Sequence, residues 1–92
     1  MVKLARSTKA GTRSLTFVLP ADRLPGIVSV VGTFNGWTPG AHVLRKRSNG
    51  TASVSVAVPA GSSVQFRYLG EGGRWFDDPD VHVTEVGGLV QA

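Results

Sequence analysis

Short turn-forming segments interrupt this chain at intervals of eight to twelve residues. They are rich in the residues that favour tight turns: PADRLPG at 20–26, NGWTPG at 35–40, SNG at 48–50, PAGS at 59–62 and GEGG at 70–73. The stretches between them are β-branched, and none shows the apolar spacing of an amphipathic helix. The sequence therefore predicts an all-β sandwich or barrel with essentially no helix.

Alternation within these stretches predicts the core, because successive side chains of a strand point to opposite faces. In TASVSVAVP (51–59) the valines share one face, and hydroxyl side chains dominate the other. In SSVQFRYLG (62–70), Gln65, Arg67 and Leu69 fall on the outer face. The predicted core consists of Leu15, Phe17, Leu19, Val28, Val30, Ala52, Val54, Val56, Val58, Val64, Phe66 and Tyr68.

Length and composition favour one domain that is neither exported nor inserted in a membrane. The 92 residues suit a single domain and contain no apolar run near the roughly 20 residues of a membrane-spanning helix. The basic N-terminal stretch is interrupted by Lys9, Gly11 and Arg13 before a signal-peptide core can form. The chain has no cysteine, which is compatible with a reducing compartment. We expect a cytoplasmic protein with a flexible basic tail over 1–12 and a β-sandwich module over 13–92.

Positive charge is concentrated in two segments, and the net charge is +4. The first holds Lys3, Arg6, Lys9 and Arg13, and the second is 45–47. Basic patches attract nucleic-acid phosphates, but single-strand binders add aromatic stacking platforms, and HVLRKRSNG (42–50) has none. We therefore expect a solvated hairpin and tail and no nucleic-acid partner. Steep salt dependence of binding would distinguish the nucleic-acid alternative.

Both tryptophans lie near turns and outside the inward positions of the predicted strands. Trp37 follows Asn35 and Gly36, which support a tight turn, and Trp75 follows the glycine-rich segment 70–73. Phe34 fits as an apolar anchor under the first turn. For a tryptophan in a small domain, core packing is the commonest role. The positions near turns raise the alternative of a ligand platform.

Two segments resemble a known family of sugar-binding modules. VVGTFNGW (30–37) and VPAGSSVQFRYLGEGGRWFDDPD (58–80) resemble the glycogen-binding module of the AMP-activated protein kinase beta subunit and the N-terminal early-set domain of isoamylases and branching enzymes, which together form carbohydrate-binding module family 48. The resemblance covers about residues 13–92 with the segments in family order. It implies an immunoglobulin-like (early-set) β-sandwich of about seven strands.

The resemblance also implies a ligand and a site. In the family, the two corresponding tryptophans line a shallow surface for α-1,4-linked glucan, which places Trp37 and Trp75 there. Arg67 stands where the kinase modules have a lysine that hydrogen-bonds sugar hydroxyls. The chain departs from these modules in DDPDVHVTEVGGLVQA (77–92), which is several residues shorter in the loop that contacts sugar. Gly88 stands at the position of a contacting asparagine.

The acidic and histidine residues favour structural roles over catalysis or metal binding. Asp77, Asp78 and Asp80 offer the paired carboxylates of glycosidases, but DDPD is also an ordinary turn composition, so we expect no enzyme. His42 and His82 lack metal-ligand spacing. The sequence thus predicts neither a cofactor nor a metal site.

Taken together, the sequence predicts a stand-alone, non-catalytic module for glycogen-like or starch-like α-glucan, accessory to a separate glycogen-metabolism enzyme. The alternative is a protein-protein interaction module of the same fold that has lost sugar binding. The departures near Gly88 favour this alternative, and the retained Trp37, Arg67 and Trp75 oppose it. An exposed aromatic pair serves either kind of ligand, so both hypotheses stand at this level.

Overall fold

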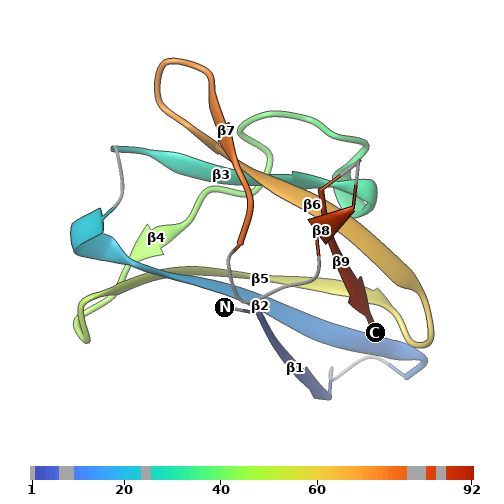
Figure 1. The fold of residues 1–92 in the computed structure, drawn as a ribbon. Helices are drawn as coiled ribbons and strands as arrows, with labels where there is room; N and C mark the ends of the chain where they lie inside the picture. The colour runs from blue at the N-terminus through green and yellow to red at the C-terminus, as the bar shows by residue number, and fades with distance from the viewer. Residues whose placement is uncertain (1, 7–9, 24–25, 79–82, 85–86) are drawn as a thin grey trace.

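The chain folds as an all-β sandwich of two packed antiparallel sheets, as the sequence predicts. The computed structural model describes residues 2–6, 10–23, 26–78, 83–84 and 87–92. Figure 1 shows β3 and β6 in the upper layer and β2 and β5 in the lower one. Within the described ranges, the helical elements are two single 3-10 turns, η1 (Ala21–Arg23) and η2 (Thr33–Asn35).

Each sheet is built around one long pair of strands. The four-stranded sheet has the order β1 (Val2–Arg6), β2 (Thr12–Pro20), β5 (Thr51–Pro59) and β4 (Arg45–Lys46). The five-stranded sheet has the order β3 (Val28–Gly32), β6 (Ser63–Gly70), β9 (Gly87–Gln91) and β8 (Val83–Thr84), and β7 (Arg74–Phe76) also pairs with β6. The described residues therefore form nine strands, against the expected seven or so.

The core lies between the two sheets and confirms the predicted inward positions, although β3 does not alternate because all five of its residues are buried. Of the twelve side chains predicted to face inward, eleven are buried, and Val54 is partly buried and packs against them. Phe17 lies at the centre, with ring centroids 4.8 Å from Phe66 and 5.6 Å from Phe34. The contact with Phe34 confirms its expected role as an anchor beneath the turn. Burial of these rings, together with the aliphatic side chains around them, stabilises the fold.

Asp78, two residues after β7, is tied to the core by a buried hydrogen bond. The Tyr68 hydroxyl donates to Asp78 Oδ2 at 2.9 Å, and both residues are fully buried. Buried polar groups are normally paired in this way, because an unpaired one costs free energy. Asp78 thus has the structural role that the sequence analysis expects. Asp80 lies outside the described residues.

The N-terminal segment forms a strand where the sequence analysis predicts a flexible tail. Val2–Arg6 is β1, which pairs antiparallel with β2 from Val2↔Phe17 to Arg6↔Arg13. The physical reason is that β2 would otherwise present an open edge, and Val2 packs against the core beside it. β2 begins at Thr12, one residue before the predicted boundary of the module.

The outer face of the four-stranded sheet is polar and solvated. Thr16 and Ser55 lie opposite each other on β2 and β5, and their hydroxyls are 2.8 Å apart. Arg45 and Lys46 are exposed in β4, which confirms the expected solvated hairpin. Among the described residues, no helix is long and apolar enough to cross a membrane.

Candidate functional site

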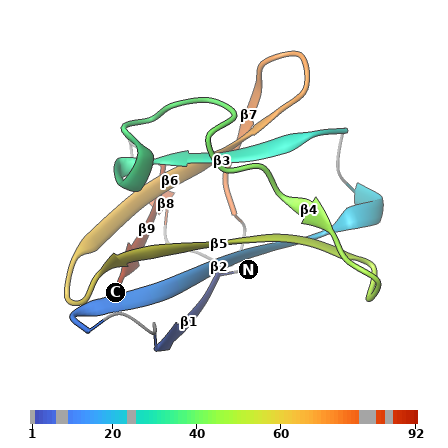
Figure 2. The ribbon, with the colours of Figure 1, turned by 180° about the vertical axis from the view of Figure 1, so that it is seen from behind.

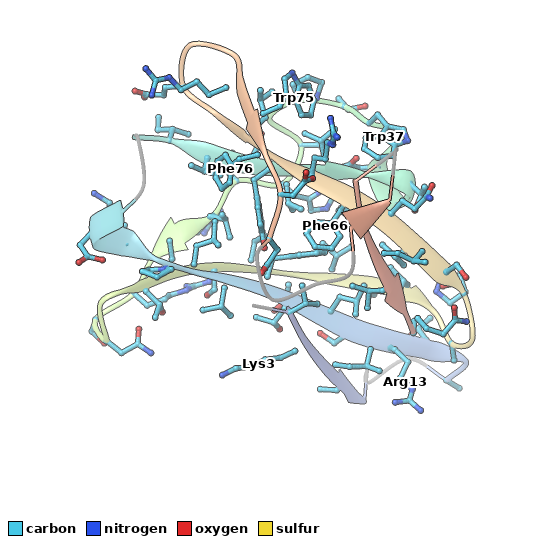
Figure 3. The ribbon with its side chains drawn as sticks, viewed as in Figure 1. Lys3, Arg13, Trp37, Phe66, Trp75 and Phe76 are labelled. Carbon is cyan, nitrogen blue, oxygen red and sulfur yellow. The ribbon has the colours of Figure 1, made fainter. Side chains whose placement is uncertain are left out.

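The three predicted site residues lie on the outer face of the five-stranded sheet. Along β6, buried side chains alternate with the half-buried Gln65, Arg67 and Leu69, so the predicted outward direction of Arg67 is confirmed. Figure 3 shows Trp37 and Trp75 on the upper side of this sheet, whereas Phe66 lies below it, between the layers. The fold therefore gathers two aromatic rings and one guanidinium on a single surface.

A row of cross-strand neighbours extends across the sheet from Trp75. Trp75 pairs with Leu69 across β7 and β6, Leu69 pairs with Ser29 of β3, and Ser29 forms an isolated bridge with Val43. Residues directly opposite in an antiparallel sheet share a face, so this row runs across the outer surface. Trp75, which lies at one end of this row, is 49% exposed.

The turn before Trp37 is fixed by the side chain of Asn35. Its Oδ1 accepts the Gly32 N–H at 3.0 Å, and its Nδ2 donates to the Val30 carbonyl at 3.1 Å. The same Nδ2 lies 3.0 Å from His42 Nδ1. These contacts confirm that Asn35 bonds the backbone and holds the turn. They also give His42 a structural role, as the sequence analysis expects.

The backbone at Trp37 is strained. Gly36 adopts φ 62° and Trp37 follows with φ 60°, the one non-glycine residue with positive φ in the part of the chain that the structure describes. A bulky residue rarely adopts this conformation, which costs on the order of 1 kcal/mol. The Trp37 amide donates to the Gly32 carbonyl at 2.9 Å, which holds the turn against β3. The fold thus maintains an unfavourable backbone conformation that brings this indole to the surface.

Arg67 is oriented by an acidic neighbour and by a glycine. Its Nε lies 3.3 Å from Asp77 Oδ1, and the two side chains are 36% and 29% exposed. A Cβ added at Gly87 would lie 2.7 Å from Arg67 Cγ, so the arginine stem requires a glycine at this point of β9. Neither Arg67 Nε nor Asp77 Oδ1 makes a hydrogen bond in the described residues, so the pair is held by charge alone. The terminal N–H groups of an arginine are further donors.

Sequence reasoning missed Asp77 as the partner of Arg67. A signal for it existed in the hairpin register, because Leu69↔Trp75 and Tyr68↔Phe76 place the next residues, Arg67 and Asp77, opposite each other. Gly87 was missed because its neighbour on β6 depends on the long-range pairing with β9. Gly88 is buried opposite Phe66 and presents no side chain to this surface.

The surface has no feature of a metal centre within the ranges described. No group of three or more histidine, cysteine, aspartate or glutamate side chains is placed to hold a metal ion there. His82 lies outside the described residues. What the surface offers chemically is apolar ring area, with hydrogen-bond donors from one arginine beside it.

Comparison with known proteins finds no family model that matches the chain and no curated protein that matches it.

Replacing Asn35 by alanine tests how the turn is held. We expect the free energy of unfolding to fall by about 1–2 kcal/mol, because the Gly32 N–H and the Val30 carbonyl lose a part-buried partner. Urea denaturation followed by circular dichroism measures this loss. Asn49→Ala is the control, since Asn49 makes similar contacts in an exposed turn. Equal losses in the two variants would contradict the assigned role of Asn35.

Proposed function

We propose that the outer surface of β3, β6 and β7 binds α-1,4-glucan of the glycogen or starch type and that the chain is a non-catalytic carbohydrate-binding module. Trp37 and Trp75 act as stacking platforms and Arg67 as a polar donor. The proposal rests on the family resemblance together with the clustering of these three residues on one face. It includes a cytoplasmic location and a separate glycogen-metabolism enzyme as partner, as the sequence analysis expects.

The observation that carries the proposal is the strained backbone of Trp37. Glycine or asparagine would adopt φ 60° at much lower cost, so stability alone does not favour tryptophan there. Strain of this kind is concentrated at ligand sites, where a side chain must be presented in a fixed direction. The indole is only partly buried, so packing recovers part of its apolar area at most. A role in ligand contact accounts for the residue.

The chemistry of the surface suits a glucan. A pyranose has an apolar C–H face and a rim of hydroxyls, so an indole covers the face and charged donors at the edge fix its orientation. Each ring buries about 60 Å² of apolar surface, which contributes on the order of 1.5 kcal/mol before the costs of binding. Two rings give micromolar to millimolar affinity, which repeated contacts with a polymer strengthen.

Asp77 has a defined part in this proposal. Its charge attracts the guanidinium at Nε and restricts the positions that the arginine side chain adopts. Arg67 therefore loses less side-chain entropy when it donates to a neutral sugar hydroxyl, which lowers the cost of binding. Asp77 is therefore a positioning residue for Arg67.

The exposed apolar row supports the alternative function, an interaction module for a protein partner. Trp75, Val43 and Ile27 are exposed, Ile27 at 63%, whereas Ser29 within the row is buried. Exposed apolar side chains mark protein interfaces as well as sugar sites. The experiment below separates the two.

The test is a titration of the whole chain with maltoheptaose, followed by tryptophan fluorescence and by amide chemical shifts. Trp37→Gly and Trp75→Ala are each expected to abolish the saturable response. Trp37→Gly is also expected to stay within about 1 kcal/mol of the wild-type stability, because relief of backbone strain offsets lost contacts. Leu4→Ala, on an exposed strand of the other sheet, is the control and should bind normally.

Three results would oppose the proposal. No amide shift at tens of millimolar sugar would favour a protein partner. A loss of about 3–5 kcal/mol in Trp37→Gly would show that the ring is part of the core. Binding that weakens steeply with salt would indicate a charged ligand, because a neutral sugar responds little to ionic strength.

A further inference from the structure

Positive charge is concentrated in the four-stranded sheet. Six of the ten basic residues lie in this sheet or directly after β4. They are Lys3, Arg6, Arg13, Arg45, Lys46 and Arg47. The six acidic residues lie outside these strands, at positions 22, 71, 77, 78, 80 and 85. This sheet therefore attracts acidic groups and repels basic ones.

One edge of β5 is open along half of its length. β2 pairs with the whole of β5 on one side, from Thr12↔Pro59 to Pro20↔Thr51. On the other side, β4 pairs only with Ala52 and Ser53. Figure 2 shows β4 beside one end of β5, with the other end uncovered. Among the described residues, no strand pairs with this edge between Ser55 and Pro59.

The backbone groups of Ser55 and Ala57 point to the open edge. The Thr51 carbonyl accepts the Arg47 N–H at 2.7 Å, so residue 51 directs its backbone groups to the β4 side. In an antiparallel strand this direction repeats at every second residue, which includes 55 and 57. The close Thr16–Ser55 hydroxyl contact agrees, because side chains are nearer in the pairs that do not exchange backbone hydrogen bonds. Ser55 and Ala57 thus present N–H and C=O groups that a further strand can pair with.

Two hollows lie along the same edge. The first, of about 480 Å³, is bounded by residues 40–43, by Arg45 and Arg47, and by Val54 and Ser55 of β5. The second, of about 230 Å³, includes Phe34, Val58 and Val64 in its lining. The open edge therefore has a mixed polar and apolar recess at one end and a mainly apolar recess at the other, and side chains of a paired strand can enter such recesses.

Arginines mark one end of this edge. Arg47 donates from Nε to Ser53 Oγ at 3.0 Å and from Nη2 to the Ser53 carbonyl at 3.3 Å, which holds its guanidinium against β5. Arg45 is exposed on the paired strand beside it. Both arginines line the first hollow, and guanidinium groups bind carboxylates by charge-assisted and often bidentate hydrogen bonds.

We propose that the open edge of β5 accepts an extended acidic segment of a partner protein as an additional strand. Backbone groups of the segment pair with Ser55 and Ala57, its carboxylates lie at Arg45 and Arg47, and its apolar side chains enter the two hollows. A second copy of this chain fits less well, because its own β5 has no acidic residue. Nucleic acid also fits less well, because no exposed aromatic ring lines the edge. This surface meets the proposed glucan face at Val43, which bridges to Ser29 and also lines the first hollow.

The test uses two synthetic peptides of alternating valine and threonine, one ending with two aspartates and the other with two asparagines, because a strand antiparallel to β5 ends next to Arg45. Titration of the isotope-labelled chain should shift the amides of Ser55 and Ala57, and the acidic peptide should bind about tenfold or more tightly. Ala57→Pro should abolish binding, because it removes a donor at the open edge without breaking the pairing with β2. The double variant Arg45→Glu with Arg47→Glu should weaken binding about tenfold. Both side chains are exposed, so this test holds even if Ala57→Pro disturbs folding.

Lys3→Glu, at the opposite edge of the same sheet, is the matched control. It should leave the affinity unchanged. If it weakens binding as much as the arginine reversals do, the attraction is diffuse and the proposal is wrong. Absence of shifts at Ser55 and Ala57, or tighter binding of a single-stranded oligonucleotide at this edge, would also overturn it.

Discussion

Replacing Phe17 by alanine is expected to lower the free energy of unfolding by about 3–5 kcal/mol. Phe17 is fully buried and packs against Phe34, Phe66 and Tyr68, with ring centroids 4.8 to 6.5 Å apart. The substitution removes the apolar area of one ring and leaves a cavity that three large side chains cannot all close. Since a domain of this size is stable by only about 5–15 kcal/mol, the variant would keep little of its stability.

Urea denaturation of the variant, followed by circular dichroism, measures this loss. Phe17→Leu is expected to cost only about 1.5 kcal/mol, because most of the apolar volume remains. Leu4→Ala should stay within about 0.5 kcal/mol, since Leu4 is 41% exposed in β1. A loss in Phe17→Ala no greater than that in Phe17→Leu would mean that the aromatic cluster is not the centre of the core.

The position of Phe17 illustrates what could be predicted from the sequence. Its burial, and that of the side chains it meets on β6, follows from period-two alternation within each strand. Alternation depends only on the geometry of a strand and needs no knowledge of the partner strand. Turn residues every eight to twelve positions likewise predicted the all-β fold without information on pairing. Burial and fold class were therefore predictable from local pattern.

Features that depend on long-range pairing were less predictable. The strand Val2–Arg6 forms because β2 has an edge to cover, and local composition in that segment is basic and ambiguous. The contact of Arg67 with Asp77 needs the register of the β6–β7 hairpin, and the contact with Gly87 needs β9. The strain at Trp37 also depends on context, because Gly36 alone satisfies the usual requirement of a turn for positive φ.

Most of the GTFNGW segment has a structural explanation that leaves Trp37 as the exception. Phe34 stacks on Phe17, Asn35 bonds the backbone at Gly32 and Val30, and Gly36 adopts φ 62°. Each of these residues lowers the free energy of the turn. Trp37 raises it, so the other residues of the segment hold the backbone in the conformation that Trp37 requires.

Gly32, the first residue of this segment, carries the second large effect. Its φ of −168° is extended backbone that any residue adopts, so the requirement for glycine is steric. An added Cβ would overlap the Gln65 carbonyl oxygen and lie 2.8 Å from a Phe34 ring carbon and 3.0 Å from Phe66 Cβ. Gly32→Ala is therefore expected to cost about 3 kcal/mol, the upper end for overpacking of a tight site.

Gly72→Ala provides the matched comparison for this prediction. Gly72 has φ 77° and no atom within 4 Å of an added Cβ, so its cost of about 1 kcal/mol comes from backbone conformation alone. Gly32→Ala should exceed it by roughly 2 kcal/mol in urea denaturation, because the added methyl must displace β6 backbone. It should also weaken maltoheptaose binding, because Gly32 holds the turn of Trp37. The Gly32 carbonyl accepts a hydrogen bond from the Trp37 amide, and the Gly32 N–H donates to Asn35 Oδ1. If the two alanine variants are equally stable, β3 and β6 are free to separate, and close packing at Gly32 does not fix the turn that presents Trp37.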